Sequence, residues 1–257
     1  FNSTFYDRYF RPIGLKKGLL NPETKLQRRD WMETWGDWKH NRRIESHLST
    51  IESLGLYNIS GHELKRYLLK RIWRPMPLVR DQACAKIENH LSKQLGRNSV
   101  DDFIAFSVRR GDKARENFVF PTLDRYIIAA ERAAILHFPA DDKMPTIFVA
   151  TDDCSVMNDF RSRRPRWNFV SECDVPHHQS KDGFRIEEMT LWNHEATDAH
   201  FGKFMVELYA MAAAKYFIGV IYTNVTWWAY FMRMDDPSTF QILKTPGTEN
   251  REGIDYW

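Results

Sequence analysis

The sequence lacks the glycine-rich motifs that most often bind nucleotide phosphates. Neither the GxGxxG pattern of dinucleotide-binding turns nor a phosphate loop ending in Lys-Ser/Thr occurs among its 257 residues. These absences exclude a glycine cradle. Any phosphate group bound by this chain is therefore expected to be held by arginines and by the start of a helix.

Apolar runs long enough to cross a membrane are also missing. The longest run, 216–232, contains Thr223, Asn224 and Thr226 and is shorter than the roughly 20 residues that a membrane-spanning helix needs. We interpret it as a buried strand followed by a helix, and we expect no membrane contact. No internal repeat or low-complexity segment is visible.

Neither sign of charge is in large excess. The 37 basic and 34 acidic residues give a net charge of +3 and are mixed along the chain, without a basic tail. This pattern argues against a nucleic-acid partner. Aromatic residues, in contrast, reach 14%, which fits either stacking on sugars or bases or ordinary packing in a core.

Cysteine is scarce, with only Cys84, Cys154 and Cys173, and these have no zinc-ligand spacing. Cys154 and Cys173 follow consecutive predicted strands. Parallel neighbours lie about 4.8 Å apart, so their turns can bring the two Cα atoms within the roughly 4.4–6.8 Å of a disulfide. Cys84, on the expected apolar side of a helix, would be the free thiol.

Several features favour the secretory pathway, so we expect a Golgi or secreted location. Three Asn-x-Ser/Thr acceptor triplets occur, at Asn2, Asn58 and Asn224. The chain begins at Phe1 rather than Met, and we expect that a segment carrying any targeting signal preceded it.

Hydrophobic periodicity predicts alternating helices and strands after the first sixty residues. Helices are expected at 62–72, 79–96, 121–138, 155–163, 199–215 and 225–234. Strands are expected at 103–108, 146–150, 167–171 and 216–221. Repeated βα units imply an α/β fold, with flanking helices on a parallel, Rossmann-like sheet. We assign 1–60 to an aromatic and basic extension that packs on this domain, and 61–257 to the domain itself.

The first predicted strand ends in the charged segment Arg109-Arg110-Gly111-Asp112-Lys113. Open α/β sheets bind ligands at the carboxyl ends of their strands. Because side chains alternate along extended backbone, one arginine can reach an anionic ligand while the other pairs inward, for example with Asp112. The expected ligand is a phosphate or diphosphate; a solvated basic turn closed by its own aspartate is the alternative.

Three more polar segments follow strands and should lie at the same edge: 151–153, 173–178 and 222–224. Among them, Asp152-Asp153 and His177-His178 have no third ligand at a suitable spacing, so we expect no metal site.

The segment FSVRRGDK resembles the H-x-R-R-x-D-K signature of the GDP-fucose-dependent α1,6-fucosyltransferases and their O-fucosyltransferase relatives. Flanking pieces are similar to the same family in the same order: KRYLLKRIWRPMPLV, Tyr126, FVATDDCSV, NFVSE and MVELYAMAAAKYFIGVIYTNVTWWAY. The resemblance covers roughly 61–234. It implies the nucleotide-binding half of a GT-B-like inverting glycosyltransferase, with a GDP-sugar as donor substrate, a glycan or glycoprotein acceptor, and no metal or cofactor.

The resemblance also implies roles for individual residues. Arg109 or Arg110 would bind the diphosphate with help from Lys113, and Asp112 would hold the arginines in place. Family positions near the nucleotide fall on Asp152, Asp153, Glu207 (guanine), Thr223 and Asn224 (phosphates).

Two departures from the family pattern concern chemistry. The first histidine of the signature is Ser107 here, which removes a ring that would lie against the base. Asn117 stands where the family has its proposed catalytic glutamate, and asparagine cannot act as a general base. The nearest carboxylate is Glu116, which would have to take over this role after a shift of the loop.

Two functions therefore remain open. The first is an inverting transferase, most simply a fucosyltransferase, in which Glu116 is the base while Arg110 and Lys113 stabilise the departing diphosphate. The second is a non-catalytic relative that binds a sugar, a nucleotide or a protein.

Overall fold

The structure is a computed structural model that describes residues 75–95, 102–111, 119–138, 144–174, 191–220, 223–233 and 237–244. The chain divides into two compact units, and all the helices and strands below belong to the unit Met76–Asn250. The domain boundary expected after residue 60 and the helix expected at 62–72 lie outside the described residues.

Five parallel strands form one sheet in the order β3-β2-β1-β4-β5. They are β1 (Phe103–Val108), β2 (Thr146–Thr151), β3 (Phe169–Val170), β4 (Tyr216–Val220) and β5 (Phe240–Leu243). All residues of β1, β2 and β4 are buried, because helices cover both faces of the sheet, and such strands are apolar almost throughout. The predicted α/β class with a parallel, Rossmann-like sheet is confirmed.

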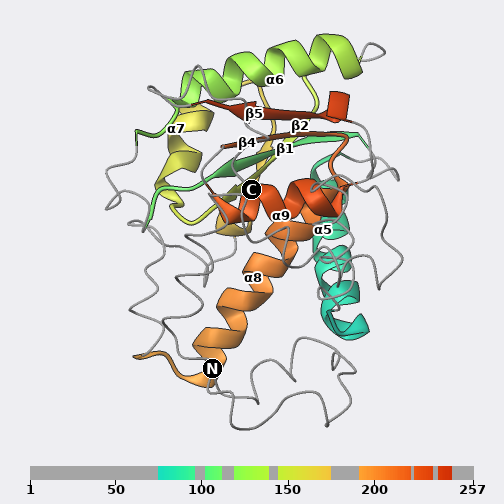
Figure 1. Cartoon of the computed structure of the whole chain (residues 1–257), viewed down its shortest axis with the longest axis vertical. Helices are drawn as coiled ribbons and strands as arrows, with labels where there is room; N and C mark the ends of the chain where they lie inside the picture. The colour runs from blue at the N-terminus through green and yellow to red at the C-terminus, as the bar shows by residue number, and fades with distance from the viewer. Residues whose placement is uncertain are drawn as a thin grey trace, which may run out of the picture. The chain divides into compact units, whose positions relative to one another are not determined.

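Helices cover the two faces of this sheet (Figure 1). They are α5 (Pro77–Leu95), α6 (Leu123–His137), α7 (Ser155–Arg163), α8 (His194–Ala213) and α9 (Asn224–Met232). Helices α6 and α7 lie on one face, while α8 and α9 lie on the other, where α5 packs against α8. In the described part of the chain, no helix has both the length and the apolar character needed to cross a bilayer.

The core on the α6 face is built from alternate strand residues and aromatic rings. Phe106 of β1 lies between Tyr126 of α6 and Phe160 of α7, with ring centroids 5.4 and 5.5 Å apart. Phe160 in turn stacks on Phe169 of β3 at 5.4 Å. These rings bury large apolar surfaces and fix α6 and α7 against the carboxyl half of β1. The opposite face packs against the buried side of α8, which carries Met205, Val206, Leu208 and Met211.

The main differences from the sequence-based expectation concern three elements. Strand β5 was not predicted, because its four residues are mostly half-buried at the edge of the sheet and show no clear alternation. Strand β3 is shorter than the expected 167–171. Helix α8 begins five residues before the predicted residue 199, because the side chain of Asn193 caps it by accepting a hydrogen bond from the Ala196 amide at 2.8 Å.

Gly219 allows the first turn of α9 to lie directly on β4. A Cβ at this position would be 2.4 Å from Cγ2 and 3.0 Å from Oγ1 of Thr226. Gly219→Ala should therefore lower the free energy of unfolding by about 1–3 kcal/mol, as overpacking of a core usually does. Chemical denaturation measures this change. Gly202→Ala is the matched control: nothing lies within 4 Å of that added methyl on α8, so stability should stay unchanged or rise by up to about 1 kcal/mol.

Candidate functional site

The chain reverses its direction through the sheet between β1 and β4. It moves from β1 outward to β2 and β3, and then returns to the other side of β1 for β4 and β5. In doubly wound sheets the crevice outside the carboxyl ends of two such strands is the usual ligand site. In this chain that position is formed by the turn after β1 and by the start of α9 after β4.

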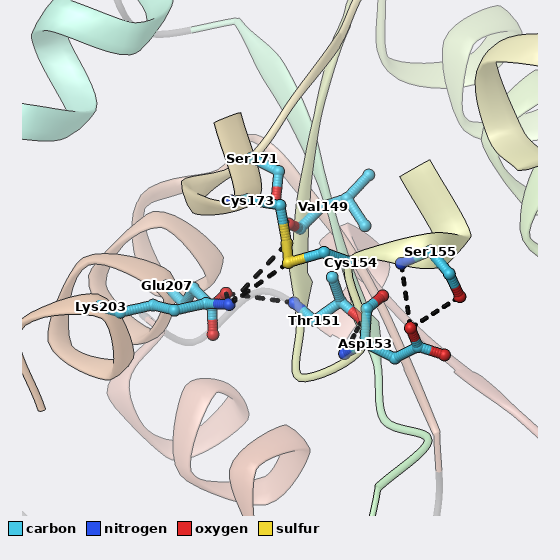
Figure 2. The surroundings of a disulfide bond; sticks show 9 residues. All are labelled: Val149, Thr151, Asp153, Cys154, Ser155, Ser171, Cys173, Lys203 and Glu207. Carbon is cyan, nitrogen blue, oxygen red and sulfur yellow. Dashed lines mark hydrogen bonds and ion pairs between the residues drawn. A yellow bond between two sulfur atoms is a disulfide. The ribbon is translucent and has the colours of Figure 1, made fainter. Parts of the chain in front are cut away.

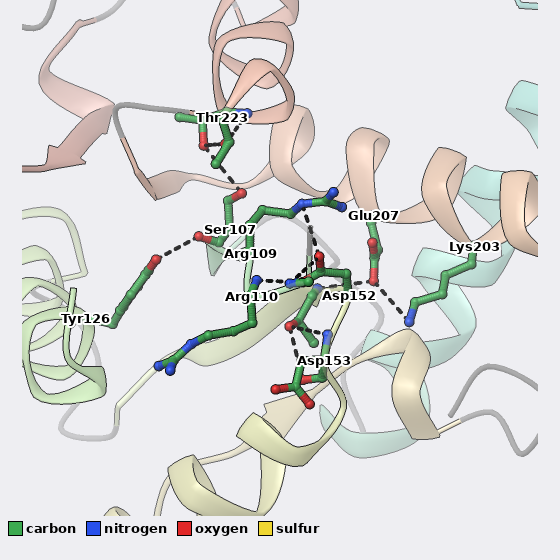
Figure 3. A network of polar contacts seen from close by, with 12 residues as sticks. Ser107, Arg109, Arg110, Tyr126, Asp152, Asp153, Lys203, Glu207 and Thr223 are labelled. Atoms are coloured by element: carbon green, nitrogen blue, oxygen red, sulfur yellow. Dashed lines mark hydrogen bonds and ion pairs between the residues drawn. The ribbon is translucent and has the colours of Figure 1, made fainter. Parts of the chain in front are cut away.

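The two arginines after β1 point in different directions (Figure 3). Arg109 turns inward, and its Nε lies 3.4 Å from Oδ2 of the buried Asp152. The guanidinium of Arg110 points away from that carboxylate and lies 5.6 Å from the ring centroid of Phe120. This is the division of roles expected for neighbouring side chains on extended backbone. The inward partner of Arg109 is Asp152; Asp112, the partner suggested from sequence, lies outside the described residues.

Asp152 holds the backbone of this turn as well as the arginine. Its Oδ1 accepts a hydrogen bond from the Arg110 amide at 2.8 Å, and its Oδ2 accepts one from the Gly111 amide at 3.0 Å. The parallel register explains the contact, because Val108 pairs with Thr151 and the next residues of β1 and β2 are therefore neighbours. Two amide donors and a guanidinium thus surround the Asp152 carboxyl group. Asp152 thus fixes the conformation from which the Arg110 side chain extends.

A tyrosine and three hydroxyl groups support the same turn from the two faces of the sheet. On the α6 side, the Tyr126 hydroxyl donates to the Ser107 carbonyl oxygen at 2.9 Å, and burial raises the pKa of this phenol. On the α9 side, the Ser107 hydroxyl lies 3.4 Å from Oγ1 of Thr226, which is 2.7 Å from Oγ1 of Thr223. Thr223 also caps α9 by accepting from the Thr226 amide. Ser107 is thus buried under α9, where it connects β1 to the start of that helix.

Asp153 and Thr151 stabilise the turn after β2. Oδ1 of Asp153 accepts hydrogen bonds from the amide of Ser155 at 2.9 Å and from its hydroxyl at 2.7 Å, which satisfies a free donor at the start of α7. Oγ1 of Thr151 accepts from the Asp153 amide at 3.1 Å.

Glu207 of α8 is a buried carboxyl group close to this turn. Its Oε1 accepts a hydrogen bond from the Thr151 amide at 3.2 Å and lies 3.8 Å from Nζ of Lys203. Burial raises its pKa from the ordinary 4.5 to about 7, although Lys203, the Thr151 amide and Arg109 favour the charged form. Glu207 therefore gains and loses its proton close to neutral pH.

The raised pKa of Glu207 predicts a pH-dependent stability. Between the unfolded pKa of 4.5 and the folded pKa of about 7, the folded chain binds the extra proton, so the free energy of unfolding falls as the pH rises through this window. Glu207→Gln should remove that loss and should gain about 2–3 kcal/mol relative to the parent chain between pH 5 and pH 8. Denaturant unfolding at both pH values measures the change. Glu131→Gln removes a half-exposed carboxylate on α6 and is the matched control, whose relative stability should shift much less.

A disulfide between Cys154 and Cys173 connects the ends of β2 and β3, with Cα atoms 5.5 Å apart (Figure 2). This pairing, predicted from the two consecutive strands, is confirmed. A loop of this length contributes about 3 kcal/mol in the chain-entropy view. Cys84 is free, as predicted, but it lies on the exposed side of α5 rather than on the apolar side. The apolar positions there are Ala83, Ile87 and Leu91, one residue out of phase with the cysteine.

The structure brings six of the predicted site residues to this edge of the sheet: Arg109, Arg110, Asp152, Asp153, Glu207 and Thr223. Four other predicted or discussed positions lie outside the described residues: Asp112, Lys113, Glu116 and Asn117. Asn224 begins α9, but its side chain is likewise outside the described part. Within the described ranges, no group of three or more His, Cys, Asp or Glu side chains could hold a metal ion.

Sequence reasoning missed Lys203, a buried lysine in the middle of α8, and Arg233, just after α9. Arg233 Nη1 donates to the carbonyl oxygens of Met211 at 2.9 Å and Ala214 at 2.6 Å, so that its charge stabilises the carboxyl end of α8. Neither residue directly follows a strand. The expectation that ligands bind at strand ends therefore did not predict either residue as part of the site. The only signal in the sequence is a charged residue within or beside an apolar helix.

Fold and site together define an α/β domain that presents a cationic turn at the switch point of its parallel sheet. No protein-family model matches the sequence, and no curated protein matches it. Similar solved structures include three structures of fucosyltransferases, two of them of NodZ. One is NodZ α-1,6-fucosyltransferase soaked with GDP-fucose, at 19% identity and a TM-score of 0.41, over 69% of this chain and 49% of that chain. Another is fucosyltransferase NodZ from Bradyrhizobium, at 16% identity and a TM-score of 0.42, over 75% of this chain and 51% of that chain. The third is a mutant of Arabidopsis thaliana FUT1 in complex with GDP, at 11% identity and a TM-score of 0.38, over 70% of this chain and 36% of that chain. The chain spans about half the length of the NodZ structures and about a third of the FUT1 structure.

Proposed function

We propose that this chain supplies the donor-binding part of an inverting glycosyltransferase that uses GDP-fucose. The observation that carries the proposal is the geometry of Arg110. Asp152 fixes the backbone of the turn that carries Arg110, and the guanidinium of Arg110 points away from the Asp152 carboxylate. This turn lies at the switch point of the sheet. A planar guanidinium in this place is suited to bidentate contact with a diphosphate. The resemblance of FSVRRGDK to the fucosyltransferase signature supports the choice of donor.

In the proposed reaction a carboxylate accepts the proton of the acceptor hydroxyl, and the oxygen of that hydroxyl attacks the anomeric carbon of the sugar. The bond from that carbon to the β-phosphate oxygen breaks, and GDP leaves with the electron pair. Arg110 stabilises the charge that develops on the diphosphate. Attack from the side opposite the leaving group inverts the anomeric configuration. We propose that no metal takes part, that the acceptor is a glycan or glycoprotein, and that the chain works in the Golgi or is secreted. The disulfide supports an oxidising compartment.

The test is incubation of the chain with GDP-fucose and a panel of glycan acceptors in the presence of EDTA. The proposal predicts release of GDP together with a fucosylated glycan, and the product should show inverted configuration by NMR. Transfer that needs an added divalent cation would contradict the metal-independent mechanism. Absence of transfer to any acceptor would count against the enzyme.

A second function, binding without catalysis, is favoured by two observations. Asn117 occupies the position of the family glutamate, and Ser107, which replaces the signature histidine, is buried against Thr226. A chain of this kind would bind GDP or a GDP-sugar at the same turn and would transfer nothing. GDP binding without transfer distinguishes it from the enzyme.

A further inference from the structure

A buried lysine lies beside the disulfide (Figure 2). Lys203 extends from α8, and its Nζ is 3.8 Å from Sγ of Cys154 and 3.8 Å from Sγ of Cys173. The side chain is about nine-tenths buried, at 10% exposed. Lysine is rarely found at such depth unless its charge has partners. The proposed donor binding does not explain why a positive charge is buried next to two sulfur atoms.

The charge of Lys203 acts differently on the two redox states. In the disulfide form both sulfur atoms are neutral, and Nζ of Lys203 lies 3.8 Å from the carboxyl group of Glu207. After reduction, a thiolate at either cysteine would carry a full negative charge beside the same ammonium. A neighbouring lysine stabilises thiolates. Lys203 therefore favours the reduced pair over the disulfide.

The disulfide and Lys203 lie close to the residues that fix the turn after β1, which we call the arginine turn because it carries Arg109 and Arg110. Cys154 comes two residues after Asp152, which holds the Arg110 and Gly111 amides. The carboxylate of Glu207, which faces Lys203, also accepts a hydrogen bond from the Thr151 amide at 3.2 Å. The end of β2 is thus fixed by the disulfide and by a hydrogen bond to the carboxylate of Glu207. Lys203 lies close to both the disulfide and this carboxylate.

We propose that the Cys154–Cys173 disulfide is a thiol-sensitive clamp on the turn after β2, and that Lys203 is the positioning residue that makes it reducible. A small-molecule thiolate attacks Sγ of Cys154, which is less buried than its partner. The bond between the cysteines breaks, and Cys173 leaves as a thiolate beside Lys203. A second thiolate attacks the mixed disulfide, which yields the oxidised small molecule and releases Cys154 as a thiolate that takes up a proton. Reduction frees the turn that carries Asp152 and so weakens donor binding, a consequence that rests on the proposed function.

The first test measures the equilibrium between the disulfide and glutathione redox buffers, using the folded full chain and mass spectrometry of alkylated thiols. Lys203→Met should shift the equilibrium about tenfold toward the disulfide, which corresponds to about 30 mV for two electrons. Lys203→Arg should restore most of the parent value. Lys215→Met is the matched control, because that lysine pairs with Asp102 beside β1 and should leave the equilibrium unchanged. Should Lys203→Met fail to fold, Lys203→Gln gives the same comparison. A Lys203→Met or Lys203→Gln variant that is reduced as readily as the parent chain overturns the proposal.

The second test compares GDP affinity in the oxidised and reduced chain. We expect the reduced chain, and the double variant Cys154→Ser/Cys173→Ser, to bind GDP three- to tenfold more weakly. Equal affinities in both states would overturn the coupling between the clamp and the arginine turn. Absence of GDP binding in both states would count against the proposed function instead, and the glutathione equilibrium of the Lys203 variants would still decide whether the clamp exists.

Discussion

Arg110→Ala should abolish measurable binding of GDP while leaving the fold intact. A bidentate, charge-assisted contact to a desolvated phosphate is worth roughly 2–5 kcal/mol, which is a loss of affinity from about 30-fold to several thousandfold. Among the described residues, the guanidinium of Arg110 lies 5.6 Å from the ring centroid of Phe120, and loss of such a cation–π contact should change the free energy of unfolding by less than about 1 kcal/mol. Equilibrium dialysis with labelled GDP measures the first quantity, and denaturant unfolding the second.

Three variants distinguish the role of Arg110 from a general effect of charge. Arg110→Lys should recover little affinity, because an ammonium group lacks the planar fork of the guanidinium. Arg109→Ala should instead destabilise the fold, since it removes the cation that faces the buried Asp152. Arg132→Ala removes an exposed arginine on α6 and should leave both quantities unchanged. Parent-like GDP affinity in both Arg110 variants would rule out the phosphate contact.

Glu116→Gln should reduce turnover by a factor of about 10²–10⁴ and leave GDP affinity nearly unchanged, because a general base acts in the transition state and not on the nucleotide. Glu116 lies outside the described residues, so its role is proposed from its position in the sequence, one residue before Asn117. Three of the described carboxylates are already engaged with other groups. Asp152 and Asp153 are occupied with backbone amides, and Asp124 pairs with Arg163 at 2.7 Å on the exposed side of α6. Single-turnover kinetics with saturating GDP-fucose measures the effect.

Asp124→Asn is the control for the Glu116 variant. Leu123, Ile127 and Ala130 of the same helix are buried, so the Asp124 carboxylate points away from the sheet. Its removal should leave turnover within about twofold of the parent chain and cost at most about 1 kcal/mol of stability, the usual value of an exposed ion pair. If Asp124→Asn lost as much activity as Glu116→Gln, the assignment of the base would be wrong.

The central elements of the fold could be predicted because their sequences allow few alternatives. The runs at β1, β2 and β4 are apolar on both faces, short, and followed by polar turns, which is the pattern of buried parallel strands. Helix α7 was predicted with the bounds that the structure shows, Ser155–Arg163, because a turn precedes it and Pro165 follows it closely. The disulfide followed from the same reasoning, since two cysteines come directly after neighbouring parallel strands.

The contacts within the site could be predicted only in part. Alternation along extended backbone indicates that Arg109 and Arg110 point in different directions, but it does not name the partner. A nearby aspartate in the sequence, Asp112, was the natural candidate. The partner that the structure shows, Asp152, is 42 residues away from Arg110 and is brought there by the register of two strands. Side-chain partners of this kind depend on tertiary packing, which local patterns do not encode.

The buried charges were the least predictable feature. Lys203 and Glu207 are four residues apart on α8, a spacing that normally marks a solvated ion pair on a helix surface. Here both side chains are about 10% exposed, because α8 is covered by the sheet on one side and by α5 on another. Burial raises the pKa of Glu207 and places Lys203 close to the disulfide. A sequence shows the spacing but not the burial.

Calorimetric titration of the parent chain with GDP in a buffer that contains EDTA tests the central claim most directly. The account predicts saturable binding at one site without added metal, with heat that disappears in the Arg110→Ala variant. A folded chain that shows no binding of GDP under these conditions would contradict the assignment of the turn after β1 as a diphosphate site.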